Sequence, residues 1–415
     1  MIQTRSLLRI SAVLATAFTI QTSMAEDWPQ WRGADRSDHC KETGLIQSLP
    51  GNGPKQLWLS REAGLGYSGF SVAEGSLYTM GLKDNTEFLM AFNVRDGKLR
   101  WSAKVGSRYE NRWGDGPRCT PTVEGNQVFA VGGQGDIVAV SVADGKVQWT
   151  ASMTDMGGKR PNWGYCESLL VDGGQVVCTP GGNKGAMAAL DRRNGKVLWQ
   201  SKDWTDGAQY ASIVPATIHG KKQYIQLTQK TLVGIDASNG DVLWESPWQG
   251  RTAVIPTPIV KGDEVYIASG YGVGCKKVKV AKDFSVEDVW VNKVMKNHHG
   301  GVILLEGHLY GYSDGAGWVC QSWETGEEVW AEKNEFRKGA IFYADGRFYL
   351  LEEQTGNVAM IEASSKGWKE HGRFKLSPQT EQRSPQGKIW VHPVISAGKL
   401  FLRDQELLFC FDAKK

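Results

Sequence analysis

The feature that most constrains this chain is a short segment that recurs along its whole length. In each copy an apolar stretch ends in a polar residue, a turn with Gly follows, and a short second stretch ends in Trp. The clearest copies are residues 189–199 (ALDRRNGKVLW) and 234–244 (GIDASNGDVLW). Further copies end at Trp101, Trp149 and Trp330, with a weaker one at Trp290. Because Asp-Gly and Asn-Gly adopt positive φ at low cost, each copy predicts a tight β-hairpin.

The spacing of the copies predicts the architecture. The position that aligns with Asp191 falls at residues 93, 141, 191, 236, 282, 322, 362 and 412, so neighbouring copies are 40 to 50 residues apart. Additional strand patterns lie between the copies, which gives four short strands to each unit. A repeat of this length is typical of propeller blades. We therefore predict an all-β fold, an eight-bladed β-propeller of four-stranded blades.

The last copy of the repeat is incomplete. Phe409-Cys410-Phe411-Asp412 is the first half of a unit, and the missing half lies at the other end of the chain, in Lys55-Gln56-Leu57-Trp58. A ring closed by pairing this N-terminal strand with the C-terminal blade leaves no sheet edge exposed. A parallel solenoid, the main alternative, does not require a divided unit. The Trp residues of the repeat are expected to pack between neighbouring sheets.

Residues 1–25 have the pattern of a cleavable export signal. Arg5 and Arg9 are followed by eleven mostly apolar residues at 10–20, and Ser23-Met24-Ala25 resembles a cleavage site. Eleven residues are fewer than the roughly 20 needed to span a bilayer, and no cysteine lies near the cleavage site. We therefore expect an exported protein, periplasmic or secreted, with no transmembrane segment and no lipid anchor.

The remainder divides into two parts. Residues 26–54, which include Trp28-Pro29-Gln30-Trp31-Arg32-Gly33, are expected to form an N-terminal cover segment, and residues 55–415 the propeller. The seven cysteines show no CxxC spacing, and Cys178 and Cys410 lie in apolar strand contexts, which indicates small buried side chains. Basic and acidic residues are balanced at 48 and 45, which argues against nucleic-acid binding.

The A-x-D-x-x-x-G-x-x-x-W pattern at 189–199 resembles the tryptophan-docking motif of pyrroloquinoline-quinone (PQQ) dehydrogenases and of their non-enzymatic relatives, the outer-membrane assembly propellers. The resemblance extends from Trp58 to Asp412. Asn297-His298-His299-Gly300-Gly301, Leu402-Arg403-Asp404-Gln405 and the segment around Trp28 resemble secreted PQQ-like propellers of planctomycete-type bacteria. This resemblance implies the fold rather than one function, because the docking Trp is structural in all of these proteins.

The loops that lead into the first strand of each blade carry the chemically active side chains, and a propeller brings such loops to one face of its central channel. The candidate channel residues are Arg112, Trp113, Asp115, Arg118, Asn162, Trp163, Tyr165, Glu167, Tyr210, Arg251, His298, His299, Arg337 and His392. Arg pairs with carboxylates and Trp stacks on rings, so this set suits an anionic, planar ligand such as PQQ. Ca²⁺ requires several oxygen ligands, for which Glu167, Asn162 and Asp115 are the candidates.

Structural roles for the same residues are an open alternative. Arg118 and Glu167 would then form an ion pair between blades, and Trp113 and Trp163 would cover the channel. Adjacent strand residues point to opposite faces, so at most one of the neighbours His298 and His299 is expected to face the channel. A two-His metal site is therefore not expected.

Two absences favour binding over dehydrogenation. The alcohol dehydrogenases that this chain resembles have adjacent cysteines above the quinone and additional loops around the substrate, and this chain has no Cys-Cys pair. We expect a binding or scaffolding module with a protein, peptide, glycan or small-molecule ligand at the channel face. The alternative is a PQQ- and Ca²⁺-dependent alcohol dehydrogenase of the polyvinyl-alcohol type. A hydrolase or lyase is a weaker alternative, since no Ser-His-Asp or paired-carboxylate spacing stands out.

Overall fold

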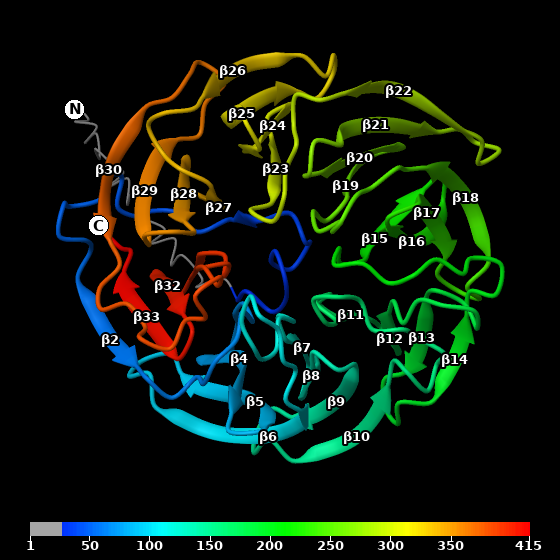
Figure 1. The fold of residues 1–415 in the computed structure, drawn as a ribbon, viewed down its shortest axis with the longest axis horizontal. Helices are drawn as coiled ribbons and strands as arrows, with labels where there is room; N and C mark the ends of the chain where they lie inside the picture. The colour runs from blue at the N-terminus through cyan, green and yellow to red at the C-terminus, as the bar shows by residue number, and fades with distance from the viewer. Residues whose placement is uncertain (1–26) are drawn as a thin grey trace, which may run out of the picture.

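The computed structural model describes residues 27–415, and the predicted signal peptide at 1–25 lies outside them. The described residues form strands β1 to β33 and no helix. The strands make eight sheets, which follow one another around a central axis (Figure 1). The predicted eight-bladed β-propeller is therefore confirmed. Residues 27–415 accordingly contain no helix with the length and apolar character that crossing a membrane requires.

Each blade is an antiparallel sheet whose strands run in order from the channel to the rim. Blades one to four comprise β3 (Ser71–Ala73), β4 (Ser76–Lys83), β5 (Thr86–Asn93) and β6 (Leu99–Ser107); β7 (Thr122–Glu124), β8 (Gln127–Val131), β9 (Asp136–Ser141) and β10 (Val147–Ser152); β11 (Leu170–Asp172), β12 (Gln175–Cys178), β13 (Ala188–Asp191) and β14 (Val197–Gln200); β15 (Val214–Ile218), β16 (Lys221–Leu227), β17 (Thr231–Asp236) and β18 (Val242–Pro247).

The other four blades follow the same order. They comprise β19 (Ile259–Lys261), β20 (Glu264–Ser269), β21 (Gly274–Val280) and β22 (Val286–Asn292); β23 (Val302–Leu305), β24 (His308–Ser313), β25 (Gly317–Ser322) and β26 (Glu328–Glu332); β27 (Gly339–Ala344), β28 (Arg347–Glu352), β29 (Asn357–Glu362) and β30 (Glu370–Lys375); β31 (Val394–Ser396), β32 (Lys399–Asp404), β33 (Leu407–Asp412) and β2 (Gln56–Ser60). The short strand β1 (His39–Cys40) adds to blade seven, parallel to β27.

The predicted ring closure is confirmed. Strand β2 pairs antiparallel with β33, with Trp58 opposite Cys410. Arg403, which is completely buried, also stabilises the contact between blade eight and blade one. Its guanidinium donates hydrogen bonds to the carbonyl oxygens of Ser68 and Met80 at 3.0 and 2.7 Å, so blade eight is tied to blade one. Burial lowers the pKa of Arg403 to about 9.

The tryptophans of the repeat hold neighbouring blades together, as predicted. Trp149 of blade two lies against Gly195 of blade three, and its indole N–H donates to the Arg192 carbonyl at 2.8 Å. Gly195 has a φ of +73°, and a Cβ there would lie 2.6 Å from the Trp149 ring. One glycine therefore serves both the hairpin turn and the contact between blades.

Residues 28–42 form a plug that runs through the central channel, blue at the centre of the ring in Figure 1. Their partners lie in every blade in turn. These contacts are Trp28 with Val72, Pro29 with Val123, Arg36 with Ser168, Leu169 and Ile213, Trp31 with Thr257, Arg32 with Val302, Asp38 with Tyr343, and Glu42 with Gly398. The plug is therefore hydrogen-bonded to all eight blades.

Candidate functional site

A cavity of about 230 Å³ lies at one mouth of the channel, and we call it the channel-mouth pocket. Trp31 and Arg32 of the plug line it together with the loops that lead into the first strands of seven blades. Its aromatic side chains are Trp31, Tyr67, Trp113, Trp163, Tyr210, Tyr271, Trp390, His298, His299 and His392. The loops therefore converge at one face, and the pocket that they form is mainly aromatic.

Small hydroxyl side chains from consecutive blades form a second feature of this pocket. Thr120, Ser168, Ser212 and Thr257 come from blades two to five, and all four line the cavity. The Thr120 N–H donates to Ser168 Oγ at 3.0 Å, and the Ser168 N–H donates to Ser212 Oγ at 2.9 Å. We call these four residues the hydroxyl belt. The bonds within it join adjacent blades and leave the serine O–H groups able to donate elsewhere.

Arg118 also lines the pocket, and it is held in a fixed position. Its guanidinium donates to the carbonyl oxygens of Gly116 and Gly114 at 2.5 and 2.7 Å. The group lies over the ring of Tyr67 at 5.2 Å and that of Tyr109 at 4.8 Å. These partners are uncharged, so the expected alternative of an ion pair with Glu167 is wrong. Arg118 keeps its positive charge beside the cavity.

Glu167 is turned away from the pocket into blade three. It is 3% exposed, and its carboxylate accepts hydrogen bonds from the Thr179 N–H and from Gln226. Burial raises the pKa of Glu167 to about 7, against the lowering effect of the Thr179 bonds and of Arg36. The carboxyl group therefore satisfies backbone and amide donors inside the blade.

The three calcium candidates are not brought together. Asp115 forms an ion pair with Arg108 and also accepts the Asn111 N–H at 2.8 Å, while Glu167 is enclosed as described. Asn162 is exposed, and its carbonyl oxygen accepts a hydrogen bond from Tyr109. Within residues 27–415 no three His, Cys, Asp or Glu side chains form a group that could hold a metal ion. The residues present therefore do not fit a Ca²⁺ site.

Seven candidates line the channel-mouth pocket, and seven do not. The lining candidates are Trp113, Arg118, Trp163, Tyr210, His298, His299 and His392. Outside it are the three calcium candidates and Arg112, Tyr165, Arg251 and Arg337. The Arg112 guanidinium lies 5.7 Å from the centre of the Trp113 ring, and Tyr165 donates to the Pro180 carbonyl at 3.1 Å. Arg251 and Arg337 are exposed.

His298 and His299 both line the pocket, so the expectation that at most one would face the channel is wrong. The reason is local conformation: both residues lie in the irregular loop between β22 and β23, where the alternation of a strand does not apply. The two ring centroids are 5.0 Å apart.

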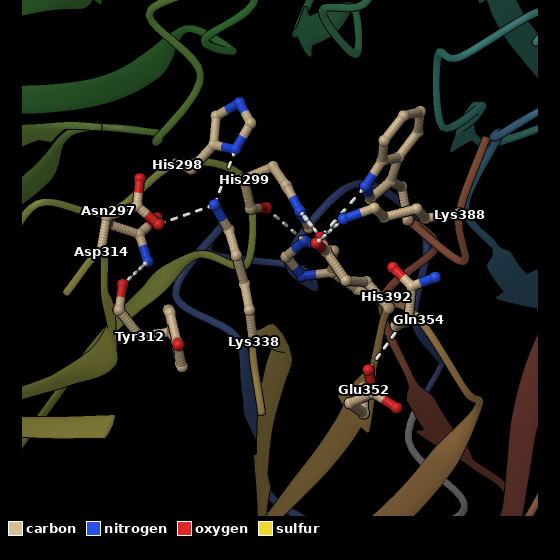
Figure 2. A network of polar contacts seen from close by, with 12 residues as sticks. Asn297, His298, His299, Tyr312, Asp314, Lys338, Glu352, Gln354, Lys388 and His392 are labelled. Carbon is tan, nitrogen blue, oxygen red and sulfur yellow. Dashed lines mark hydrogen bonds and ion pairs between the residues drawn. The ribbon is translucent and has the colours of Figure 1, made fainter. Parts of the chain in front are cut away.

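The His298 ring is neutral and held from both sides. Lys338 donates to its Nδ1 at 2.9 Å, and the Lys338 ammonium also pairs with Asp314 at 2.7 Å, as Figure 2 shows. The remaining ring nitrogen, Nε2, lies 2.7 Å from the hydroxyl oxygen of Tyr271 and donates to it. Burial lowers the pKa of His298 to about 2, and the nearby His299 and Lys338 act in the same direction.

Glu353 connects blades six, seven and eight behind the pocket wall. Its carboxylate is bonded to His299 Nε2, pairs with Lys388 at 2.7 Å and accepts the Trp390 indole N–H at 3.2 Å. Burial alone would raise the pKa of Glu353, but the hydrogen bonds and charges of His299 and Lys388 outweigh it and hold the pKa below its usual range. Figure 2 shows Lys388 and His299 approaching the same point from two sides.

His392 completes this side of the pocket. Its Nε2 donates to the His299 carbonyl at 3.0 Å, and its ring lies 4.8 Å from the Trp31 ring of the plug. Burial lowers the pKa of His392 to about 3. Like the ring of His298, the ring of His392 is therefore neutral at pH 7.

Comparison with known proteins places the chain in a family. A family model described as outer membrane protein assembly factor BamB matches residues 43–163 and 159–332. The chain belongs to the BamB family. The resemblance inferred from the tryptophan repeat is thereby confirmed. BamB of Burkholderia pseudomallei is 24% identical over 294 residues, which cover 66% of this chain and 68% of that protein.

Solved structures show the same fold in this BamB-family chain. The crystal structure of BamB from Moraxella catarrhalis superimposes with a TM-score of 0.58 at 13% identity, covering 83% of this chain and 93% of that one. The quinohemoprotein alcohol dehydrogenase of Comamonas testosteroni superimposes with a TM-score of 0.63 at 10% identity, covering 94% and 81%. The fold is thus shared with both an assembly factor and a quinoprotein dehydrogenase.

Sequence reasoning missed Tyr67 and the four residues of the hydroxyl belt, which line the pocket of this BamB-family chain, and three further residues. Glu353 follows the second strand of its blade, outside the loops from which candidates were drawn, and Tyr271 lies between β20 and β21. Lys388 lies in the loop before β31, its side chain is 31% exposed, and its ammonium group pairs with Glu353. No spacing rule joins these positions, because the contacts cross three blades.

Proposed function

We propose that this chain is an exported binding module whose ligand or partner engages the channel-mouth pocket. The observation that carries the proposal is the pocket itself, where aromatic rings and hydroxyl groups from seven blades converge above a plug that closes the channel. Pockets of this composition are typical ligand sites. Trp31 and Arg32 of the plug form part of the pocket wall, and the pocket would accept a small molecule or the tip of a larger partner.

The relatives are consistent with a partner at the outer membrane. BamB of Burkholderia pseudomallei is named an outer membrane protein assembly factor, and such a role requires contact with other proteins. A protein, a peptide or a glycan chain presenting a small group to the pocket fits both the name of the relative and the geometry. Export, expected from residues 1–25, would place this chain where such partners occur.

The alternative, a PQQ- and Ca²⁺-dependent dehydrogenase, has less support. It draws on the shared fold and on Arg118 and the tryptophans beside the cavity. Against it, Asp115 and Glu167 are engaged elsewhere, so no calcium ligand set is present among the candidates. Titration with PQQ and Ca²⁺, followed by tryptophan fluorescence and quinone absorbance, tests this alternative directly. Saturable micromolar binding that is lost in Arg118→Ala would favour it.

A thermal-shift panel tests the binding proposal. The panel would contain neutral sugars, sugar acids, aromatic acids, short peptides, and PQQ with and without Ca²⁺. At concentrations far above Kd, a true ligand should raise the Tm by about 2 °C or more. The pocket variant is Trp113→Ala, and the control is Leu198→Ala, at an apolar residue that is 52% exposed on β14.

The expected result is a shift for at least one class of compound in the natural protein and in Leu198→Ala, and none in Trp113→Ala. Shifts that are equal in all three proteins would place binding elsewhere. A complete lack of shifts would contradict a small-molecule site and leave only a macromolecular partner, which a Trp113→Ala variant must then fail to bind.

A further inference from the structure

We propose that the channel-mouth pocket recognises a small ring that carries a carboxylate group, as found at the uronic-acid end of a glycan or in an aromatic acid. This inference rests on the proposed binding function and names the chemical class of the ligand. Four features carry it: the charge of the pocket, the fixed guanidinium of Arg118, the hydroxyl belt, and the aromatic walls.

The charge of the pocket is positive. None of the described residues that line it is Asp or Glu. Of its two arginines, Arg32 pairs with Asp38 at 3.1 Å, whereas the hydrogen-bond partners of Arg118 are uncharged carbonyl groups. The rings of His298 and His392 are neutral, so the positive charge of the pocket without a carboxylate partner is that of Arg118. The acids nearest to the wall are already paired, Glu353 with Lys388 and Asp314 with Lys338. A positive site without an internal counter-ion attracts an anion, and the anion replaces water around the positive group.

Arg118 is the group that would meet the carboxylate. Of its five N–H donors, the bonds to the Gly114 and Gly116 carbonyls use two. Because the two aromatic rings and the two carbonyls already fix its position, little side-chain entropy is lost when a ligand binds. A planar guanidinium presents paired donors that match a carboxylate, and such charge-assisted bonds are among the strongest in proteins.

The hydroxyl belt supplies further donors in the wall of the pocket. Ser168 and Ser212 each accept a backbone N–H from the preceding blade, so their remaining preference is to donate. Thr120 takes part in the belt through its backbone N–H, which leaves its hydroxyl for other contacts. Neighbouring donors of this kind complement the oxygen atoms of a sugar or a carboxylate.

The walls and the volume favour a single ring. Trp113, Trp163 and Trp390 line the cavity, and indole faces pack well against the C–H face of a sugar or the edge of an aromatic ring. The volume of about 230 Å³ is below the roughly 300–1,000 Å³ of pockets for drug-sized ligands. A larger molecule would have to leave most of its body outside the mouth.

Calorimetric titration of the purified protein tests the inference with matched pairs of probes. D-glucuronate is compared with D-glucose, and benzoate with benzyl alcohol, so each pair differs mainly in the carboxylate. The variants are Arg118→Gln and Thr120→Val. The control is Arg251→Gln, which removes the same charge from an exposed residue outside the pocket.

We expect one acid of the two pairs to bind about tenfold or more tightly than its neutral counterpart. Arg118→Gln should weaken that acid about 10- to 100-fold, Thr120→Val about 3- to 10-fold, and Arg251→Gln not at all. Tight glucuronate with weak benzoate identifies a glycan end as the source, and the reverse identifies an aromatic acid. Either result supports the inference.

Equal binding of an acid and its neutral counterpart would show that the pocket does not recognise the carboxylate group, and the pocket would then be a site for neutral ligands. Loss of all probe binding, while the thermal-shift panel still shows a ligand that depends on Trp113, would overturn this inference alone. Failure of both experiments would overturn the proposed function as well. The comparison of probes on the unmodified protein does not depend on the folding of any variant.

Discussion

Blades three and seven lie opposite each other in the ring (Figure 1). In each of them a buried glutamate, Glu167 or Glu353, lies next to residues that line the channel-mouth pocket. Glu167 is 3% exposed and Glu353 is 6% exposed, so burial is similar. Yet the pKa of Glu167 is raised to about 7, and that of Glu353 is held below its usual range.

The difference lies in the donors. Glu167 accepts from the Thr179 N–H and from the neutral amide of Gln226, whereas Glu353 is bonded to the ammonium group of Lys388 and to His299. Burial penalises a carboxylate in both places, but only a cation compensates fully. A carboxyl group buried near the channel is therefore about half protonated at pH 7 in blade three and fully charged in blade seven.

The largest effect on stability is expected from removal of the charged carboxylate of Glu353. Glu353→Ala should lower the free energy of unfolding by about 3 kcal/mol, because Lys388 and Trp390 lose their acceptor in a partly buried site. Urea denaturation measures the change. Glu362→Ala, which removes more exposed pairs with Lys369 and His371, is the control and should lower stability clearly less. Equal costs for the two variants would contradict the role assigned to Glu353.

On the other side, Glu167 should make stability depend on pH. Its folded pKa of about 7 lies above the ordinary value of 4.5. The contribution of Glu167 to the free energy of unfolding is therefore full below pH 4.5 and is lost as the pH rises through 7. Glu167→Gln imitates the protonated acid and should remove this loss. Between pH 5 and pH 8, the free energy of unfolding of the variant should therefore rise by about 2–3 kcal/mol relative to that of the natural protein. Denaturation curves at both pH values measure the change, and parallel profiles would show that Glu167 is already ionised.

His392 should give the opposite pH dependence. Its folded pKa of about 3 lies below the ordinary value of 6.5, so its contribution is present above pH 6.5 and is lost as the pH falls towards 3. His392→Gln keeps a donor for the His299 carbonyl and cannot be protonated. When the pH is lowered from 7 to 5, the free energy of unfolding of the variant should therefore rise by about 2 kcal/mol relative to that of the natural protein. If the relative stability of the variant rose with increasing pH instead, the His392 ring would not be neutral in the folded protein.

The smallest effect is expected at Asp115. Its ion pair with Arg108 lies at the surface, where the Arg108 side chain is 35% exposed. Asp115→Asn should lower stability by less than about 1 kcal/mol. Addition of Ca²⁺ or of a chelator should leave the Tm of both proteins unchanged. A calcium-dependent rise in Tm that Asp115→Asn abolishes would restore the metal site.

The fold was predictable because its determinants are local and repeated. Each Trp and each turn glycine recurs at a fixed spacing, and the contact between Trp149 and Gly195 is the same contact in successive blades. The loops of the pocket were predictable for the same reason, since they occupy one place in the repeat. The individual contacts were not, because they break the repeat.

Glu353 and His299 illustrate this limit. They are 54 residues apart and meet only because blades six and seven are neighbours. The orientation of His298 and His299 depends on an irregular loop, whose conformation no periodicity describes. The side chain of Glu167 was placed in the correct blade, but whether it faces the channel or the interior depends on the donors it meets there.

The plug has a consequence for how the ring closes. In the sequence, residues 28–42 and β2 precede all of the other blade strands, and β31 to β33 come last. Each blade that follows has a hydrogen-bond partner in the plug, from Val72 in the first blade to Gly398 in the last. Strand β2 can pair with its neighbour β33 only when residues 407–412 are present. Closing the ring thus requires both ends of the chain, and a chain without β31 to β33 should leave the inner edge of β2 unpaired.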